Sequence, residues 1–571
     1  MVYETNSNNL IIENTSDGYI ENIKLDGKTL INLLCDGFKT LDNYTKLNGT
    51  YIENDKSFVR FTMGKSNKEA FRKLEKTPLT PATDYTIIVE ILENTIVDTG
   101  DYHVLYPVSN TPDTVFANLW GLTSSEATVG IHTKLISTKA SFEGCTLSIR
   151  SYVRYIEGAS GYITYRLMLL EGDHTQNPPN YFEGLKSVGE DVDKIMVSSL
   201  KSSGNLLHCE DFSITKNGVT LTYNSSNQEF TLNGTCVENN TNFYLKSTVH
   251  NRSLLGTYSG RLILLNPSME GRFHVRFSDK TYSRSVSLHN NRLTDTTTYN
   301  NGDVITFSIR VDSGQTFNND KFKVCFNKGD TSIPYEPYKE HRKEVLYKDV
   351  DGIWKKPILR EWNTIEKHSD DKYYYHKRSG EVVLNGSENW SVKNDLPTDN
   401  PQGTHLVFYV QDEKFPIKVR PYDTSSIVWI SDIIQPLSHS YGWNTSVEGL
   451  HFGTFYKSQG AKNCRYYMNI AKSKLSTQDV QGFKQWLQNN NVTVIYQLAQ
   501  EEVYECLPIP VASYKGETTY KVESGVITPI STFELDYSFG NAVNRISDVK
   551  VFNNAMKDNI KANLTKIKEV L

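Results

Sequence analysis

The feature that most constrains this chain is a repeat of domain length. "NLL" stands at residues 32–34 and again at 205–207, and each copy is followed, more than a hundred residues later, by a similar tail. The tails are "EGDHTQNPPNYFEGLK" at 171–186 and "KGDTSIPYEPYKEH" at 328–341. Solenoids repeat every 20–50 residues, whereas the two tails begin 157 residues apart and the two copies of "NLL" 173 apart, a spacing that fits domains the size of a β-sandwich. The spacing therefore predicts two related modules.

A second shared feature is an Asn-Gly hairpin within each module. "LNGTYIENDKSFVRFT" at 47–62 aligns without a gap to "LNGTCVENNTNFYLKS" at 232–247, and "LNGSENW" follows at 384–390. Asn and Gly both tolerate positive φ, so each copy predicts a tight turn. The flanks alternate apolar and polar residues, as half-buried strands do. We expect a hairpin that recurs at the same point of successive modules.

The composition predicts a mainly β protein with several cores. A chain of 571 residues is too long for one hydrophobic core. Short β-branched and aromatic runs such as "LSIRSYVRY" and "GDVITFSIRVD" are separated by stretches rich in Gly, Asn, Ser and Thr. The boundaries we predict are an N-terminal attachment segment at 1–24, β-sandwich modules at 25–190 and 191–345, a linker or hairpin at 346–380, a β-rich domain at 381–505, a short β segment at 506–540 and a C-terminal helix at 541–571.

Two helices are predicted. In "SKLSTQDVQGFKQWLQNNN" a helix begins near residues 476–479, with Phe483, Trp486 and Leu487 on one apolar face. Residues 541–571 carry a heptad pattern that predicts either an oligomeric coiled coil or an amphipathic helix docked on the preceding domain. Its a and d positions, interrupted by two asparagines, are Ile546, Val549, Asn553, Met556, Ile560, Asn563, Ile567 and Val570.

Charge and cysteine content exclude several classes of protein. With 61 basic and 66 acidic residues the chain has no basic excess, so we expect no nucleic-acid partner. Its seven cysteines are odd in number and lack C-x-x-C spacing, which indicates free thiols made in a reducing cytoplasm. The N-terminus does not resemble a signal peptide, and no apolar run is long enough to span a membrane.

Several segments resemble those of tail fibre and minor structural proteins from bacteriophages of Gram-positive bacteria. They are "NGVTLTYNSSNQEFTLNGT", "YSGRLILL", "SIPYEPY", "KYYYHKRSGEVVLNGSENW", "SKLSTQDVQGFKQWLQNNNVTVIYQLAQ" and the lead-in "NTSDGYIENIKLDGKTLINLL". Together the resembling segments cover roughly residues 13–500.

The resemblance implies a baseplate-associated, receptor-binding virion protein, made in the cytoplasm and released by lysis. Its modules would be tandem carbohydrate-binding-module-like jelly rolls, its partners other tail or baseplate proteins and a host cell-surface glycan, and its assembly a homo-oligomer, with a trimer favoured. A structural adaptor without receptor contact, a cell-envelope glycoside hydrolase and a bacterial surface adhesin are the alternatives.

No residue pattern points to catalysis, a metal or a cofactor. The 13 histidines show neither H-E-x-x-H nor a Cys/His cluster, and no G-x-S-x-G elbow occurs. "YYYHKR" at 373–378 is interpreted as one strand of a hairpin, with "RSGE" as the turn that follows it. Sugar recognition needs an exposed aromatic ring, and the candidates are Tyr441, Trp443, Trp120 and Trp390.

The tail at 328–341 has two interpretations. Its tyrosines and glutamate could form a recognition motif, or the prolines could end one module and begin the next. Because a looser copy closes the first module too, we predict a seam between modules, with the tyrosines packed on their own module.

Overall fold

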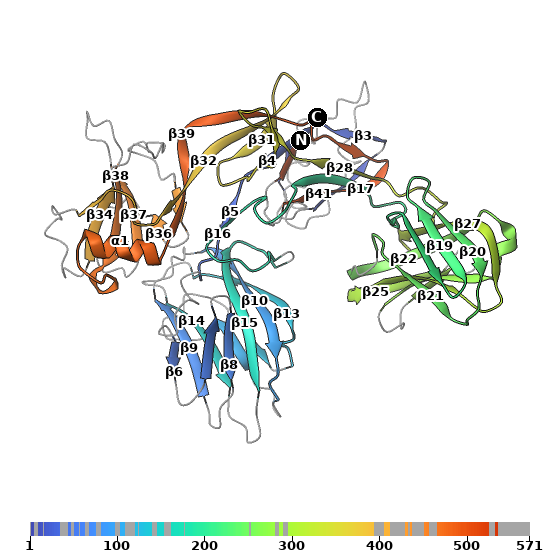
Figure 1. Ribbon diagram of the computed structural model, residues 1–571, viewed down its shortest axis with the longest axis horizontal. Helices are drawn as coiled ribbons and strands as arrows, with labels where there is room; N and C mark the ends of the chain where they lie inside the picture. Colours follow the sequence, from blue (N-terminus) through green and yellow to red (C-terminus); the bar gives the residue numbers. More distant parts are fainter. Residues whose placement is uncertain are drawn as a thin grey trace, which may run out of the picture.

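Apart from short gaps, the computed structural model describes residues 9–34, 82–97, 120–139, 161–279, 295–392 and 465–524, together with isolated strands outside these ranges. This part of the chain is mainly β, as predicted, with one short α-helix, α1 (Val480–Asn489). Figure 1 shows three β units around a central group of strands, which we call the hub. Among the described residues, no helix combines the length and apolar character needed to cross a bilayer.

The hub is built from sheets that gather distant parts of the chain. Its largest described sheet has the order β1 (Val2–Glu4), β42 (Ser531–Glu534), β4 (Asn22–Asp26), β31 (Thr364–Lys367), β32 (Tyr373–Leu384), β39 (Val492–Cys506), β29 (Tyr347–Lys348) and β30 (Trp354–Lys355), with β35 (Trp429–Ser431) also paired to β39. A second sheet has the order β2 (Asn9–Asn14), β41 (Gly516–Glu523), β17 (Met196–Lys201) and β28 (Glu340–Glu344). Two further pairs join β3 (Gly18–Ile20) to β40 (Val511–Ser513) and β5 (Thr29–Ile31) to β16 (Leu185–Ser187).

One hydrophobic core joins these hub sheets. Its buried side chains include Ile23, Val197, Ile365 and Tyr520, which come from four separate stretches of the sequence. Strands such as β4 alternate buried and half-buried residues, because successive side chains of a strand point to opposite faces. Apolar residues at every second position thus suffice to make each stretch one wall of a shared core.

Each β unit is attached to the hub through an antiparallel pair of strands. The chain enters the first unit after β5 and returns in β16, enters the second after β17 and returns in β28, and enters the third along β32 and returns along β39. In the same way β2 pairs with β41, so residues near both ends of the chain share one sheet. Residues 9–14 and 18–26, which include most of the expected attachment segment, are therefore largely hub strands.

Unit 1, at the bottom of Figure 1, consists of two sheets. One has the order β13 (Gly130–Ser137), β10 (Asp84–Asn94), β15 (Tyr162–Glu171), β8 (Phe58–Thr62) and β7 (Tyr51–Asp55). The other has the order β12 (Trp120–Thr123), β11 (His103–Val108), β14 (Thr146–Val153), β9 (Lys68–Glu75) and β6 (Tyr44–Lys46). From β10 and β15, Ile88, Met168 and Leu170 reach into the hub core, so unit 1 and the hub share buried surface.

Unit 2 also has two sheets but a core of its own. One sheet has the order β18 (Phe212–Lys216), β19 (Val219–Asn224), β20 (Glu229–Thr235), β27 (Thr316–Lys328), β22 (Ser253–Leu264) and β25 (Asp295–Val304), and the other β21 (Thr241–Leu245), β26 (Thr306–Val311), β23 (Phe273–Ser278) and β24 (Ser285–Leu288). Phe277 stacks on Phe326 at 4.2 Å between ring centroids and so connects the two sheets. All buried members of this core lie between residues 207 and 326.

Unit 3 combines a sheet with α1. The described strands have the order β33 (Trp390–Val392), β34 (His405–Val410), β38 (Arg465–Ala471), β37 (Leu450–Phe455) and β36 (Ile434–Pro436). Asp479 caps α1 by accepting a hydrogen bond from the Gly482 N–H at 2.9 Å. Phe483 and Leu487 are fully buried, and Trp486 packs against the same core. The helix predicted from residues 476–487 is confirmed.

The "NLL" repeat proves to be a pair of asparagines whose Oδ1 atoms accept corresponding hydrogen bonds. Asn32 Oδ1 accepts from the N–H groups of Leu34 at 3.1 Å and Leu169 at 3.2 Å, while its Nδ2 donates to the Phe182 carbonyl at 2.9 Å.

In unit 2 the Oδ1 of Asn205 accepts in the same way, from Leu207 at 3.1 Å and Phe326 at 3.0 Å, whereas its Nδ2 donates to Val324, within the last strand, at 3.3 Å. Both asparagines are buried, so each one ties the beginning of a unit to its last strand.

The Gly-Asp turns after those last strands also correspond. In unit 1 the Thr86 hydroxyl donates to the Gly172 carbonyl, and in unit 2 the Ser259 hydroxyl donates to the Gly329 carbonyl, both at 2.6 Å. Each glycine has positive φ, which explains why glycine stands there. The repeat inferred from the amino-acid sequence is therefore also seen in corresponding hydrogen bonds of the two units.

The alignment of the Asn-Gly hairpins was wrong by one strand. β8 pairs with β15, as β20 pairs with β27, so the hairpin of β7 and β8 corresponds to that of β19 and β20. The turn in unit 2 is Asn217–Gly218, with φ of 48° and 82°. Asn233–Gly234 instead lies within β20, where the register with β27 shifts.

The tail at 328–341 packs on its own unit, as predicted. The ring of Tyr338 stacks on His208 with centroids 5.0 Å apart, and Lys323 Nζ lies 5.1 Å from the ring centroid of Tyr335. Glu336 forms an ion pair with Lys201 at 2.6 Å, at the end of β17. The segment therefore contacts both unit 2 and the end of β17, the hub strand that leads into unit 2.

Candidate functional site

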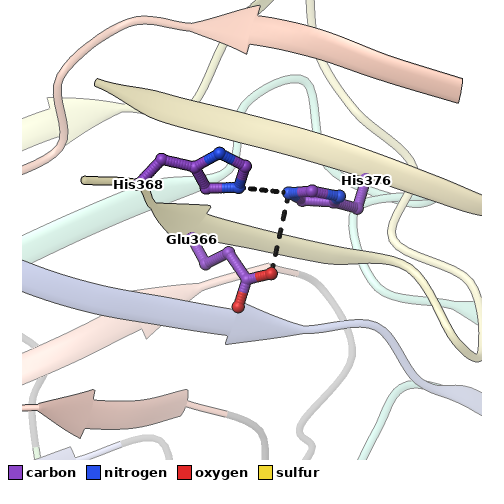
Figure 2. A group of neighbouring side chains, drawn as sticks. All are labelled: Glu366, His368 and His376. Atoms are coloured by element: carbon purple, nitrogen blue, oxygen red, sulfur yellow. Dashed lines mark hydrogen bonds and ion pairs between the residues drawn. The ribbon is translucent and has the colours of Figure 1, made fainter. Parts of the chain in front are cut away.

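The described residues contain one group of side chains with the composition of a metal site, on the hairpin of β31 and β32. Residues 364–367 pair with residues 373–376, and the turn between them is closed by the His368 N–H, which donates to the Lys372 carbonyl at 2.8 Å. Glu366 and His368 are alternate residues, so they lie on one face of the hairpin. His376 reaches the same place from β32 (Figure 2).

The three side chains converge at their tips. His368 Nε2 lies 2.7 Å from His376 Nε2, and His376 Nε2 lies 3.6 Å from Glu366 Oε1. One ligand atom from each residue lies within 4.8 Å of the others. His376 is buried, Glu366 half-buried and His368 exposed, so the group opens to solvent at the end of the hairpin.

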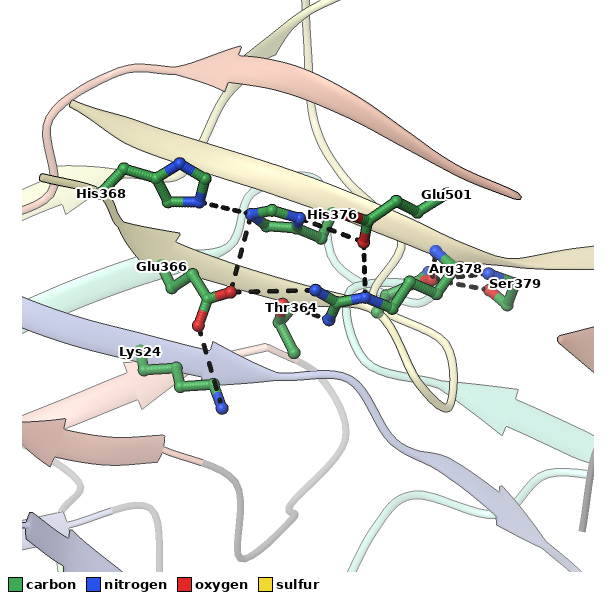
Figure 3. A network of polar contacts seen from close by, with 9 residues as sticks. Lys24, Thr364, Glu366, His368, His376, Arg378, Ser379 and Glu501 are labelled. Atoms are coloured by element: carbon green, nitrogen blue, oxygen red, sulfur yellow. Dashed lines mark hydrogen bonds and ion pairs between the residues drawn. The ribbon is translucent and has the colours of Figure 1, made fainter. Parts of the chain in front are cut away.

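A network of charged groups holds the buried imidazole (Figure 3). His376 Nδ1 lies 3.3 Å from Glu501 Oε2, on the neighbouring strand β39. The same carboxylate oxygen accepts from Arg378 Nε at 2.7 Å, and Arg378 also donates to the Thr364 hydroxyl at 2.9 Å. Glu501 thus positions His376 and Arg378 together.

The electrostatic environment of Glu501 favours its charged form. Partial burial acts to raise the pKa of Glu501, but hydrogen bonds from Arg378 and His376 outweigh it and lower that pKa below its ordinary value. At neutral pH the carboxylate is therefore an acceptor for the Nδ1–H of His376. That hydrogen bond leaves the Nε2 lone pair of His376 directed toward Glu366 and His368.

Two imidazole nitrogens and one carboxylate oxygen can hold a divalent transition metal. Nitrogen ligands of this kind suit zinc, copper, nickel and iron, whereas calcium and magnesium prefer oxygen ligands. The cluster offers no nucleophile beside a base, so its chemistry is that of ligation. The Glu501 carboxylate behind His376 matches the partner that a metal-binding histidine usually has.

Sequence analysis missed this cluster because its spacing is unlike that of a linear motif. Glu366, His368 and His376 are brought together only by the antiparallel pairing of β31 with β32. The usable signal was an acid and a histidine two residues apart, followed by a second histidine in the next strand. We had expected a turn at "RSGE", but β32 continues through it with only a shift in register between Lys377 and Ser379.

The continuity of β32 has a local cause. Asn363 Oδ1 accepts hydrogen bonds from the N–H groups of Arg378 at 2.8 Å and Ser379 at 3.0 Å, which satisfies the backbone where the strand pairing slips. Gly380 packs against the ring of Tyr496, where an added Cβ would lie 2.5 Å from a ring carbon. The β-bulge between Lys377 and Ser379 and the close packing of Gly380 therefore allow β32 to continue as one strand where the sequence predicted a turn.

The predicted carbohydrate residues lie in different places. Trp390 is 5% exposed, donates its indole N–H to Glu388 at 2.9 Å and meets Phe483 edge-on, so it is a core residue and offers no exposed ring. Trp120 is half-buried on β12, at the edge of its sheet. Tyr441 and Trp443 lie outside the described residues, as do all the heptad positions of 541–571.

An exposed tryptophan that sequence analysis passed over lies on the hairpin of β29 and β30. Trp354 is 42% exposed, and Lys348 Nζ lies 6.0 Å from its ring centroid. Beside it, Lys355 forms an ion pair with Asp349 at 2.5 Å. A partly exposed indole with lysine side chains on the same hairpin is a candidate surface for stacking on a sugar ring.

Comparison with known proteins returned no match to a protein-family model, a curated protein or a solved structure.

Proposed function

We propose that this chain is a structural component of a bacteriophage tail, a fibre or baseplate-associated protein that attaches the particle to the host cell surface. The observation that carries the proposal is the attachment of each β unit by paired strands to a hub closed by β2 and β41. Such a hub holds several β units at fixed places on one chain. The resemblance of residues 13–500 to phage fibre segments points the same way.

In this proposal the units are carbohydrate-binding-module-like sandwiches, and the partner is a glycan of the cell envelope. Outside the units, Trp354 of the hub adds a candidate contact, because an exposed indole can stack on the apolar face of a sugar and Lys348 and Lys355 lie on the same hairpin as hydrogen-bond donors. Trp120 is a second candidate on unit 1. Trp390 is withdrawn as a candidate because its ring is buried.

Oligomerisation would compensate for weak single sites. A heptad helix at 541–571 would bring three chains together, and several shallow sites acting at once can raise avidity by about 10²–10⁴ over one site. Deleting residues 541–571 and measuring the mass in solution tests this part. An unchanged oligomer after the deletion contradicts the coiled coil.

A cell-binding assay tests the function itself. We expect the full chain to bind host cells or isolated envelope glycan, and Trp354→Ala to weaken binding about tenfold or more. Tyr19→Ala is the matched control, since Tyr19 is another exposed aromatic, 56% exposed, on a different hub strand. A folded chain that binds isolated baseplates but no host cells would instead be an adaptor, and release of reducing sugar from the envelope would identify a glycoside hydrolase.

A further inference from the structure

The histidine cluster lies on the β31–β32 hairpin of the hub, and in the order of the sheet β39 stands between this hairpin and the β29–β30 hairpin that carries Trp354. β31 pairs with β4 from the beginning of the chain on one side and with β32 on the other, and β32 pairs with β39. A group bound near the end of this hairpin would act on a hairpin that lies between β4 and β39 in the hub sheet.

We propose that Glu366, His368 and His376 form a binding site for one zinc ion, which fastens the end of the β31–β32 hairpin. The three residues supply two imidazole nitrogens and one carboxylate oxygen. Structural and catalytic zinc sites are built from these ligand types, and three protein ligands leave a fourth position for water. Because His368 is exposed, the ion can enter from solvent.

The distances require only a small adjustment. Two ligand atoms at about 2.1 Å from a tetrahedral zinc lie about 3.4 Å apart. The contact of 3.6 Å between His376 Nε2 and Glu366 Oε1 already fits this spacing. The two Nε2 atoms, now 2.7 Å apart, must separate by about 0.7 Å, and the exposed His368 ring in the turn can move to allow it.

The proton arrangement also suits a metal. Glu501 accepts the Nδ1–H of His376, which leaves Nε2 unprotonated on the side of the cluster. Without an ion, the 2.7 Å contact between the two Nε2 atoms is a hydrogen bond, donated by His368 to His376. Zinc would replace that shared proton, and His368 would then carry its proton on Nδ1, which faces solvent.

The neighbouring cations make only long contacts to the carboxylate of Glu366. Arg378 lies 3.9 Å from Glu366 Oε1, yet it is held by shorter contacts to Glu501 and Thr364. Lys24 approaches the other oxygen of Glu366 at 4.0 Å and lies closer to Asp26, at 3.3 Å. Glu366 therefore keeps Oε1 for an ion, although the positive charges nearby lower the affinity of the site.

The experiment is zinc titration of the full chain after treatment with a chelator, with competition against a chromophoric zinc indicator. His368→Asn removes an exposed ligand without touching the core, and Glu366→Gln is a second variant that removes the carboxylate charge. His132→Asn is the matched control, since His132 lies on β13 of unit 1. We expect the wild type and the control to bind one zinc ion more than either ligand variant, or to bind that ion at least about tenfold more tightly.

Two further readouts make the site specific. Cobalt(II) should give a visible d–d spectrum in the wild type that is lost in His368→Asn, and magnesium should not compete with zinc even in millimolar excess. Glu501→Gln should weaken zinc binding about 10–100-fold, because it removes the partner of His376. Equal zinc stoichiometry and affinity in the wild type and both ligand variants, or zinc displaced by magnesium, would overturn the proposal.

Discussion

Units 1 and 2 begin at corresponding asparagines, yet only unit 1 contributes buried side chains to the hub. The Oδ1 atoms of Asn32 and Asn205 accept the same two hydrogen bonds, and each unit returns to the hub through a strand paired with the one that led into it. Ile88 and Met168 of unit 1 nevertheless lie in the hub core, whereas the core of unit 2 is self-contained. The same kind of connection therefore occurs in two settings. Unit 1 shares a hydrophobic core with the hub, whereas unit 2 keeps a separate core and is joined to the hub through the pair of β17 and β28.

Deleting unit 1 or unit 2 as a whole should give the largest difference, measured as the stability of the remaining hub. Replacing residues 202–338 by a short Gly-Ser linker should leave the hub folded, because β17 and β28 still pair. Replacing residues 35–180 should destabilise the hub by about 5 kcal/mol or more, since each lost buried side chain contributes about 1.5–3 kcal/mol. Calorimetry of the two deletion variants measures the difference. Equal melting temperatures for the remaining hub would contradict the difference between unit 1, which shares the hub core, and unit 2, which has a separate core.

Replacing the two asparagines is the next largest test. Asn32→Ala and Asn205→Ala should each cost about 2–4 kcal/mol, because each leaves buried backbone groups without partners. The cost of Asn205→Ala should fall on the unfolding of unit 2 alone, while Asn32→Ala should also lower the stability of the hub. Hydrogen exchange followed by mass spectrometry assigns each loss to its region. Loss of protection across the hub in Asn205→Ala would show that unit 2 is not independent.

A pair of glycines in unit 2 gives a smaller effect with an internal control. Gly218 has φ of 82°, and an added Cβ would lie 2.3 Å from the Thr235 carbonyl oxygen. Gly271 has a similar φ of 74° but nothing within 4 Å of that position. We expect Gly271→Ala to cost about 1–2 kcal/mol from the backbone alone and Gly218→Ala distinctly more. Chemical denaturation of both variants measures the two losses in free energy of unfolding. Equal losses would contradict the close packing of Gly218 against Thr235 in the turn at Asn217–Gly218.

Two buried thiols, one in each region, give the smallest expected effect. Burial raises the pKa of Cys325 in unit 2 and of Cys506 in the hub to about 12, above a reference of 9.0. The folded state favours the protonated thiols, so their contribution is complete below pH 9 and is lost as the pH rises toward 12. Stability should therefore fall by about 1.4 kcal/mol per thiol by pH 10, one unit above the reference value, and less in Cys325→Ala.

The same thiols report which region opens first. With a thiol reagent and peptide mapping, Cys325 and Cys506 should become reactive at different denaturant concentrations, because Cys325 is buried on β27 of unit 2 whereas Cys506 belongs to the hub core. Simultaneous exposure of both thiols would indicate one cooperative unit and contradict that separation.

Local features of the fold could be predicted from the sequence. The alternation of apolar residues identified the β character, and the apolar face of Phe483, Trp486 and Leu487 with a cap before it predicted α1. The repeated "NLL" identified two related units, because a buried asparagine that bonds backbone on both sides must recur wherever the connection recurs.

The hub could not be predicted, because its strands pair across most of the chain. Nothing in residues 9–14 indicates pairing with residues 516–521, since the alternation of a strand does not specify its partner. The histidine cluster depends on the same kind of information, as Glu366 and His376 meet only once β31 and β32 are in register. The hairpin alignment failed for a related reason: the same four letters precede β7 in the sequence of unit 1 and end β20 in unit 2, and β7 and β20 hold different places in the sheet order.

Strands β2 and β41, from near the two ends of the described chain, close the hub by pairing, and a designed disulfide tests this pairing directly. Ile11 of β2 lies opposite Thr519 of β41, and both are half-buried. Opposed residues of antiparallel strands have Cα atoms about 4.5–5.5 Å apart, within the range that a disulfide spans. Ile11→Cys combined with Thr519→Cys should form that crosslink on mild oxidation, identified by peptide mapping, while Ile11→Cys with Lys216→Cys should not. Absence of a crosslink between positions 11 and 519 in the folded double variant would contradict the account.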